Sequence, residues 1–307
     1  MAPSTSSPLI SLGLPVYNGE NYIHEAIDSV LSQTYSHFEL VISDNASTDR
    51  TQAICEAYAK KDSRIRYYRN AENRGAAWNF NNTFYLAQGE YFKWAAHDDV
   101  LLPRFLELTL KALKDNPDAV LAHTQVGKIE NDGVLFEESP EDGLAFDSDD
   151  PIKRFKDAVF GLHFFTNIFG LMPSSVLRET SLIGGYASSD VVLLGELALA
   201  GKLVEVPDQQ FWWRTHKEQS MQKVFHGEDH RAYTYWFNPY RKGKLNFPHW
   251  KLLSEYIRCV LSADLTFLQK LKGLKIILTS RTRISGRRQY LLDIIYAFKG
   301  KFSRHNN

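Results

Sequence analysis

Two adjacent carboxylates, Asp98 and Asp99, are the residues whose type and spacing point most directly to chemistry. They follow an apolar, aromatic run at residues 91–95 and precede Pro103, which favours the first turn of a helix. Mg²⁺ and Mn²⁺ take oxygen ligands and bridge to substrate phosphates, and such ligands bind at strand ends in open α/β sheets. The pair therefore predicts a divalent cation beside a phosphate. A turn in which Asp serves as a helix N-cap is the alternative.

The elements that must position this pair alternate regularly along the first part of the chain. We expect strands at residues 9–14, 38–43, 65–68 and 91–95, and helices at residues 21–33, 51–60, 76–87 and 104–113. This alternation predicts a mostly parallel sheet with helices on both faces. Loops after parallel strands open on one edge, so the polar loops at 15–18, 44–49, 73–75 and 97–99 should meet in one crevice.

Composition excludes several other classes of protein. The chain has 307 residues, of which 44% are hydrophobic, so it can fold as one large domain or two smaller ones. Its 36 basic and 36 acidic residues give no net charge and no argument for nucleic acid. Neither a GxxxxGK[ST] nor a GxGxxG motif occurs, which argues against a P-loop enzyme and a dinucleotide dehydrogenase.

The expected location is the cytoplasm. Cys55 and Cys259 lie far apart, without the spacing of a zinc site or a redox pair, and this fits a reducing compartment. The first residues lack the features of a signal peptide, and no apolar stretch approaches the roughly 18 residues that would span a bilayer. A soluble or peripheral protein is therefore expected.

The four polar loops, in this order, resemble the first half of a family 2 glycosyltransferase with the GT-A fold. The matching segments are residues 14–22, 32–35, 39–49, 73–75 and 89–99. The resemblance implies an α/β fold of GT-A type, Rossmann-like, with a mostly parallel mixed sheet flanked by helices. It also implies inverting transfer of a sugar from a nucleotide diphosphate to an acceptor hydroxyl, with Mn²⁺ or Mg²⁺ as cofactor.

The resemblance assigns a nucleotide-binding role to residues of the first three loops. Tyr17 would pack on the base, and Asp44 would accept a hydrogen bond from the imide N–H, which favours UDP- or dTDP-sugars. Arg74 would neutralise phosphate, and Pro15 and Asn18 belong to the same nucleotide-binding set. A core tyrosine, a turn aspartate and a solvated arginine are the structural alternatives.

In the fourth loop, the resemblance places Asp98 near the ribose and makes Asp99 the direct metal ligand. Many relatives carry a third acid just before this pair, but position 97 is His here. Whether His97 packs or touches metal is left open, with packing favoured.

The second half matches less closely. Residues 184–201 resemble the acceptor-side helix of the family, and Asp190 near its start is the candidate general base. Glu196 is the rival, although it lies deeper in an apolar helix. Residues 211–216 resemble an Arg-x-His ending in which His216 reaches the diphosphate or the metal; a hydrogen-bonded surface histidine is the alternative.

The remaining segments complete the expected organisation. Residues 202–206 predict an edge strand, residues 130–150 an exposed loop that could close over substrate, and residues 250–261, 267–279 and 289–298 helices. We expect a GT-A domain over residues 1–222, with a nucleotide-binding half (1–115) and an acceptor half (116–222), and a basic helical extension over residues 223–307.

The end of the chain is strongly basic. Residues 270–307 hold ten Lys or Arg and one acid, Asp293, mixed with apolar residues. This composition fits a helix on an anionic membrane surface. The alternative is a solvated basic face that packs on the acidic first domain.

These features predict a metal-dependent, inverting glycosyltransferase that uses a nucleotide-sugar donor and a glycan or lipid-linked acceptor. It would act in polysaccharide or glycolipid synthesis, in the cytoplasm or at the inner face of the cell membrane. A non-catalytic nucleotide-sugar-binding subunit of a glycan assembly complex is the alternative. A nucleotidyltransferase would need a Gly-rich basic loop after the first strand, and residues 15–20 contain none.

Overall fold

The computed structural model describes residues 7–130, 133–138, 146–161, 166–217, 230–242, 244–284 and 290–295. Within these residues, one sheet has five strands in the order β3-β2-β1-β4-β8. Its strands are β1 (Ile10–Val16), β2 (Phe38–Asp44), β3 (Ile65–Arg69), β4 (Tyr91–Trp94) and β8 (Met172–Pro173). β1 pairs in parallel with β2 and β4, and β2 with β3, while β8 is antiparallel.

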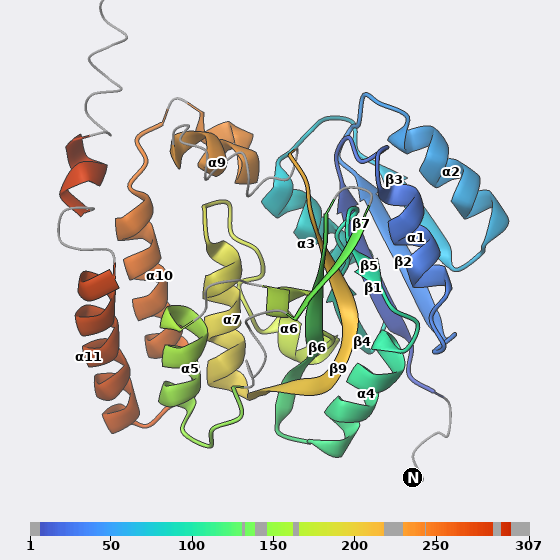
Figure 1. Cartoon of the computed structure of the whole chain (residues 1–307). Coiled ribbons are helices and arrows are strands. Elements are labelled where there is room, and N and C mark those ends of the chain that lie inside the picture. The colour runs from blue at the N-terminus through green and yellow to red at the C-terminus, as the bar shows by residue number, and fades with distance from the viewer. Residues whose placement is uncertain are drawn as a thin grey trace, which may run out of the picture.

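The helices between these strands confirm the predicted alternation. They are α1 (Ile23–Leu31), α2 (Thr51–Lys61), α3 (Ala76–Leu86) and α4 (Phe105–Asp115). In Figure 1, β1 rises from the lower right, so the carboxyl ends of the parallel strands lie at the upper end of the molecule. The fold is a mixed sheet flanked by helices, as the sequence predicts.

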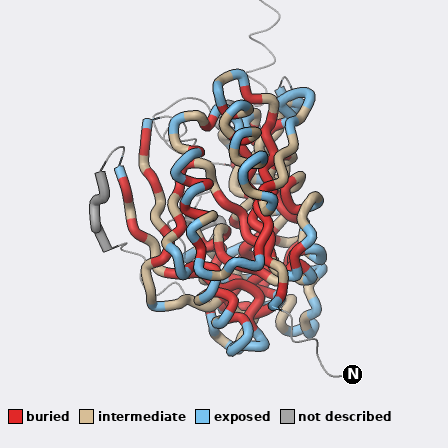
Figure 2. Tube along the Cα trace, turned by 90° about the vertical axis from the view of Figure 1, so that its right-hand side faces the viewer, coloured by how far each residue is buried: buried red, intermediate tan, exposed pale blue. Residues whose placement is uncertain are grey.

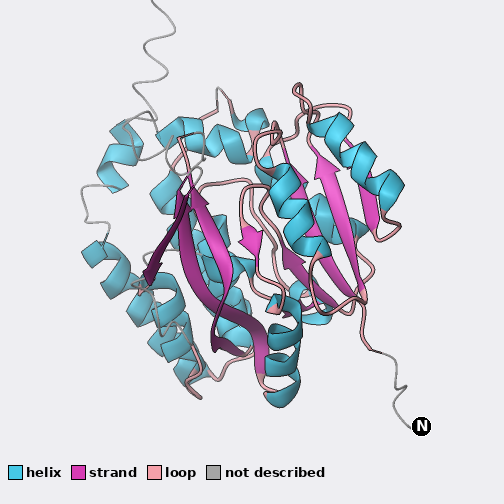
Figure 3. Cartoon of the chain, turned by 45° about the vertical axis from the view of Figure 1, so that its right-hand side comes forward, coloured by secondary structure: helices cyan, strands magenta, loops and turns pink. Residues whose placement is uncertain are grey.

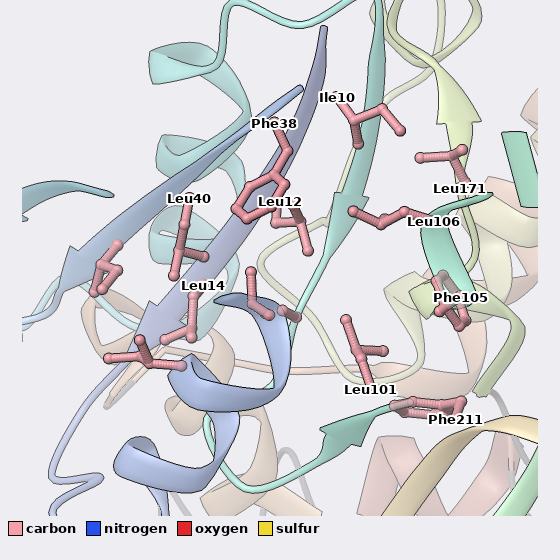
Figure 4. Close-up of a cluster of buried hydrophobic side chains, with 14 of the residues drawn as sticks. Ile10, Leu12, Leu14, Phe38, Leu40, Leu101, Phe105, Leu106, Leu171 and Phe211 are labelled. Carbon is pink, nitrogen blue, oxygen red and sulfur yellow. The ribbon is translucent and has the colours of Figure 1, made fainter. Parts of the chain in front are cut away.

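The two faces of β1 belong to different packing environments. Its residues Ile10, Leu12 and Leu14 face α1 in the apolar core drawn in Figure 4, together with residues of α4. Gly13 faces the other side, where a Cβ would lie 2.4 Å from the Thr83 hydroxyl oxygen of α3. Burial therefore runs through the sheet and the inner sides of its helices, as Figure 2 shows.

A second sheet has the order β5-β9-β6-β7 among the described residues, and Figure 3 draws the strands of both sheets in magenta. Its strands are β5 (Val100–Leu101), β6 (Ala119–Glu130), β7 (Gly133–Glu138) and β9 (Lys202–Thr215). β9 is longer than predicted and lies between β5 and β6, so the prediction of an edge strand at 202–206 is wrong. The reason is that its second half, at residues 211–212, also pairs with β5, directly after the acidic pair.

The predicted loop at residues 130–150 is also partly wrong. β7 pairs antiparallel with β6, because the run at 133–138 can continue the sheet that β6 begins. Residues 131–132 and 139–145 lie outside the described residues. Asp150 accepts a hydrogen bond from the backbone N–H of Ile152 and caps α5 (Pro151–Phe160).

The remaining helices cover the left side of the molecule in Figure 1. They are η1 (Thr166–Phe169), α6 (Ser174–Arg178), α7 (Ser189–Ala200), α9 (His230–Phe237), η2 (Pro239–Arg241), α10 (Pro248–Ser262) and α11 (Phe267–Ile284). The predicted helices at 250–261 and 267–279 are confirmed. Of the one predicted at 289–298, residues 290–295 are helical and the others lie outside the described residues.

The C-terminal helices share an apolar core with the acceptor half. Residues of α10 and α11 pack with those of α5 and α7 in one buried cluster. Gly273 of α11 fits closely there, because a Cβ would lie 2.8 Å from Val260. None of the helices described in the structure has the length and apolar character to cross a bilayer.

Candidate active site

The polar loops that follow β1, β2 and β3 meet, as the parallel topology predicts. The Asn18 backbone N–H donates to the Ser47 hydroxyl at 2.9 Å, and the Asn18 side-chain oxygen accepts from the Thr48 N–H at 2.8 Å. Asn45 in turn accepts at its side-chain oxygen from the Arg74 N–H at 3.0 Å. Asn18 has a positive φ of 52°, a conformation that Asn tolerates better than most residues.

Two of the predicted nucleotide-binding side chains are accessible at this edge. Tyr17 is 45% exposed. The Arg74 guanidinium lies 4.1 Å from the centre of the Trp78 ring. Pro15, by contrast, is a buried residue of β1 that pairs with Ser43, so it supports the loop from within the sheet.

Asp44 lies at the end of β2 and is fully buried. One carboxylate oxygen accepts from the Ser47 backbone N–H at 2.8 Å, and the other accepts from the Tyr67 hydroxyl at 2.7 Å. The Arg69 Nε lies 3.7 Å from the second oxygen. Both carboxylate oxygens of Asp44 thus already accept hydrogen bonds within the protein. The N–H of a nucleotide base would have to share one of these oxygens.

The acidic pair follows β4 and is buried. Asp98 Oδ2 lies 2.9 Å from Nε2 of His216, which is also buried, at the end of β9. Asp99 Oδ1 accepts the Arg214 backbone N–H at 2.9 Å. The structure therefore brings His216, which the sequence predicts from a separate segment, into contact with the acidic pair.

Arg214 is a site residue that the sequence reading did not single out. Its Nε donates to the backbone oxygen of Asp98 at 2.8 Å, and its guanidinium pairs with Glu25 of α1. The guanidinium also lies 4.5 Å from the centre of the Tyr22 ring, which packs on His216. The Arg-x-His pattern at residues 214–216 could have pointed to this arginine. Its partners could not be predicted, because they lie more than a hundred residues away in the chain.

Burial and neighbouring charges shift the pKa values of Asp98, Asp99 and the nearby Lys93. Burial and the neighbouring Asp98 charge raise the pKa of Asp99 well above its ordinary value. Burial also opposes the charged form of Asp98, but the charge of His97 and the hydrogen bond of His216 outweigh it and lower its pKa. Burial lowers the pKa of Lys93 to about 7, against the opposing effect of Asp99.

His97 packs against the first loop. A Cβ on Gly19 would lie 2.6 Å from the imidazole Cδ2 of His97, so the ring rests on the glycine backbone. Its Nδ1 lies 3.8 Å from Asp98 Oδ1, too far for a hydrogen bond. This arrangement fits the packing role for His97.

Asp190 lies in the first turn of α7, which begins at the upper end of the molecule in Figure 1, where β1 also ends. Its Oδ1 is buried and has no hydrogen-bond partner among the described residues. Burial raises the pKa of this carboxyl. Backbone N–H groups of the first turn oppose this rise in pKa without outweighing it. Ser188, the N-cap of α7, has φ 61° and makes no side-chain capping hydrogen bond.

Glu196, the rival of Asp190, is occupied by structural contacts. Its carboxylate accepts from the Ser181 backbone N–H at 2.9 Å and pairs with Arg258 of α10 at 2.7 Å. These contacts tie α7 to α10. They leave Asp190 as the acid of α7 without a cationic partner among the described residues.

The acidic pair fits a divalent cation. Mg²⁺ is commonly held by one or two carboxylates together with substrate phosphates. Asp98 and Asp99 supply two carboxylates. Burial and repulsion from Asp98 raise the pKa of Asp99, and a bound cation would offset both effects. Within the described part of the chain, no group of three or more His, Cys, Asp or Glu side chains is arranged to hold a metal ion, so substrate phosphates would have to complete the coordination.

Comparison with known proteins gives a consistent result. The family described as Glycosyl transferase family 2 matches residues 11–170, which is more than half of the chain. An uncharacterized glycosyltransferase of Rickettsia typhi is 40% identical over 123 residues, which cover 39% of this chain and 37% of that protein. The match thus spans little more than a third of that relative.

Solved structures share the fold. S. aureus TarS 1-349 in complex with UDP-GlcNAc superposes with a TM-score of 0.64 and 16% identity, over 96% of this chain and 81% of the TarS 1-349 chain. The mannosyltransferase PcManGT from Pyrobaculum calidifontis, in complex with GDP-Man and Mn²⁺, gives a TM-score of 0.55 and 18% identity, over 95% and 80% of the two chains.

Proposed function

This chain belongs to glycosyl transferase family 2 and is a glycosyltransferase, and we propose that it transfers a sugar with inversion from a nucleotide diphosphate to an acceptor hydroxyl. The observation that carries the proposal is the buried pair Asp98 and Asp99, held by His216 and Arg214 at the edge where the polar loops meet. An acidic pair held in this way suits a bound cation and diphosphate better than it suits a structural turn.

The donor nucleotide would lie along the loops after β1, β2 and β3. Tyr17 offers an accessible ring for the base, and Arg74 offers a cation for phosphate. Asp44 would accept the imide N–H of uracil or thymine at an oxygen that it shares with Tyr67. This role favours UDP- or dTDP-sugars, with Asp98 beside the ribose and Asn18 and Pro15 shaping the loop.

Asp99 is the proposed direct ligand of Mn²⁺ or Mg²⁺, with His216 as the second candidate. Manganese is the metal bound by the PcManGT structure. When bound, a cation would supply positive charge to offset the negative charge of the departing diphosphate, and Asp99 and Asp98 are the residues that would hold it. His216 uses Nε2 to contact Asp98, so any contact with the metal or the diphosphate in this arrangement would use Nδ1.

Asp190 is the proposed general base. As the acceptor oxygen attacks the anomeric carbon, the hydroxyl proton passes to the Asp190 carboxylate. The bond between the anomeric carbon and the diphosphate oxygen breaks, and the electron pair leaves with the nucleotide diphosphate. Two observations support this role for Asp190: its Oδ1 has no hydrogen-bond partner among the residues that the structure describes, and burial raises its pKa.

We further propose that the enzyme works on a glycan or lipid-linked acceptor at the inner face of the cell membrane. Residues 223–307 would be the basic extension of a GT-A domain over residues 1–222. The outer side of α11 exposes Phe267 and Leu268, 74% and 76% accessible, with Leu271 and Lys275 also exposed. Apolar side chains beside lysines favour an anionic lipid surface.

A thermal-shift panel of UDP-, dTDP- and GDP-sugars with and without Mn²⁺ tests the donor proposal. A ligand held by the folded state raises the melting temperature by mass action. We expect UDP- or dTDP-sugars to give the larger shift, and Mn²⁺ to increase it. No shift with any donor would contradict the proposal.

The non-catalytic alternative also predicts donor binding, so turnover separates the two. The enzyme would release nucleotide diphosphate in step with transfer to an acceptor, and Asp190→Asn would retain the donor-induced shift while losing that release. A binding subunit would show the donor-induced shift in the wild-type protein, with no transfer to lose.

A further inference from the structure

A hollow of about 300 Å³ lies beside the start of α7. Its walls come from the loop before α7, the connection after η2 and the first turns of α10. The lining includes Gly185, Tyr186, Arg241, Trp250 and Lys251. The volume is at the lower end of the range for small-molecule sites.

Trp250 gives this hollow a fixed aromatic wall. Its indole N–H donates to the backbone oxygen of Tyr290 at 3.2 Å, and the two rings meet edge to face at 5.1 Å between centroids. The tryptophan nevertheless remains 46% exposed. An accessible indole held in one orientation is suited to pack against the C–H face of a sugar ring.

The charged residues of the lining are basic. Lys251 is paired with Glu255, and its ammonium group lies 5.1 Å from the centre of the Tyr186 ring. Arg241 is exposed and has no carboxylate partner among the described residues. An unpaired guanidinium has the donor geometry to bind a carboxylate or a phosphate through two hydrogen bonds.

The hollow is close to the proposed base. Tyr186 precedes Asp190 by four residues, so their Cα atoms are at most about 14 Å apart. The adjoining loop is closely packed, because a Cβ on Gly185 would lie 2.9 Å from the Asn238 side chain. The hollow and the proposed base thus lie on one continuous segment, the loop before α7 and the first turn of that helix.

We propose that this hollow is a subsite for the acceptor, and that it selects a sugar with an anionic substituent. The ring packs on Trp250, and its carboxylate or phosphate pairs with Arg241. This inference rests on the proposed function, because it takes Asp190 as the place where the acceptor hydroxyl reacts. It adds the chemical class of the acceptor.

Saturation-transfer NMR on the full-length protein tests it with three probes: glucuronate, glucose 6-phosphate and glucose. We expect both anionic sugars to bind more tightly than glucose, and their relative affinities distinguish a carboxylate acceptor from a phosphate acceptor. Arg241→Gln should weaken the anionic probes about tenfold and leave glucose unchanged, since a hydrogen bond to a charged group is lost. Trp250→Ala should weaken all three.

Arg104→Gln is the matched control, because Arg104 is exposed at the start of α4 and pairs only loosely with Glu107, at 3.7 Å. It should bind the probes as the wild type does. A melting curve confirms that each variant folds, and Trp250→Phe should restore part of the binding lost in Trp250→Ala. Equal binding of all three probes by the wild type, or no effect of Arg241→Gln, would overturn the inference.

The same samples are titrated with UDP-sugars to separate this inference from the proposed function. Donor binding without probe binding overturns the acceptor subsite alone. Absence of donor binding overturns the proposed function, whatever the sugar probes show.

Discussion

His216 Nε2 lies 2.9 Å from Asp98 Oδ2, although 118 residues separate the two in the chain. Two residues before His216, Arg214 donates to the backbone of Asp98 and to the carboxylate of Asp99. The end of β9 thus holds the loop after β4 through hydrogen bonds to Asp98 and Asp99. These contacts orient the acidic pair from outside its own loop.

Replacing Asp99 should separate metal binding from folding. Asp99→Asn should abolish the Mn²⁺-dependent part of the donor-induced thermal shift and reduce transfer by about 10²–10³-fold. The metal-free variant should melt no lower than the wild type, because burial and Asp98 already disfavour the charged form of Asp99. Glu107→Gln, an exposed change, is the control; a full Mn²⁺ response in Asp99→Asn would contradict the assignment.

Arg214→Lys tests whether the end of β9 orients the acidic pair. Lysine keeps the charge but cannot contact the Asp98 backbone and Glu25 in the planar geometry of the guanidinium. We expect Mn²⁺ affinity or activity to fall about 10–100-fold, as for other residues that orient metal ligands. Mn²⁺ titration followed by thermal shift measures the affinity. An unchanged affinity would show that Asp98 and Asp99 hold their orientation without Arg214.

Asp190 should control the pH dependence of transfer. Burial raises its pKa, so the base becomes protonated, and transfer falls, at a higher pH than for an ordinary aspartate with a pKa near 3.9. Asp190→Asn should lower the single-turnover rate about 10²–10⁴-fold and remove this acidic limb. Donor affinity should stay within about twofold of the wild type. An acidic limb that persists in the variant would assign the base elsewhere.

Linkage gives a second readout for the same residue. A carboxyl with a raised folded-state pKa contributes stability below its unfolded pKa and loses it as pH rises through the folded value. Asp190→Asn should therefore melt at the same or a higher temperature at neutral pH. Melting curves at pH 4 and pH 7 should show a larger gain at pH 7.

Tyr17 should matter for donor binding through its ring. Tyr17→Ala should weaken donor binding about tenfold, since stacking of a base on an aromatic ring is worth about 1–3 kcal/mol. Tyr17→Phe keeps the ring and should bind like the wild type. Isothermal titration with UDP gives both affinities. Equal affinities for Tyr17→Ala and the wild type would remove this residue from the nucleotide site.

The outer side of α11 should bind anionic membranes. The double variant Phe267→Asp and Leu271→Asp should lose flotation with phosphatidylglycerol vesicles, because both side chains are exposed in the structure. Tyr85→Asp is the matched control, since Tyr85 is an exposed aromatic residue of α3. Equal flotation of the double variant and the wild type would count against membrane docking through this helix.

The sequence was sufficient to predict the parallel βα repeats, the meeting of the polar loops and the position of Asp98 and Asp99 in the loop that follows β4. These follow from short-range periodicity and from a topological rule that holds for open parallel sheets. The tertiary structure alone decided that β9 lies between β5 and β6, and that its Arg214 and His216 orient the acidic pair. Such contacts join residues more than a hundred positions apart and depend on the order and register of the strands. The periodicity of a short segment does not encode that order or register. The difference between the two acids of α7 also depends on packing between distant elements. Arg258 of α10 pairs with Glu196, whereas Asp190 Oδ1 has no hydrogen-bond partner in the described part of the chain.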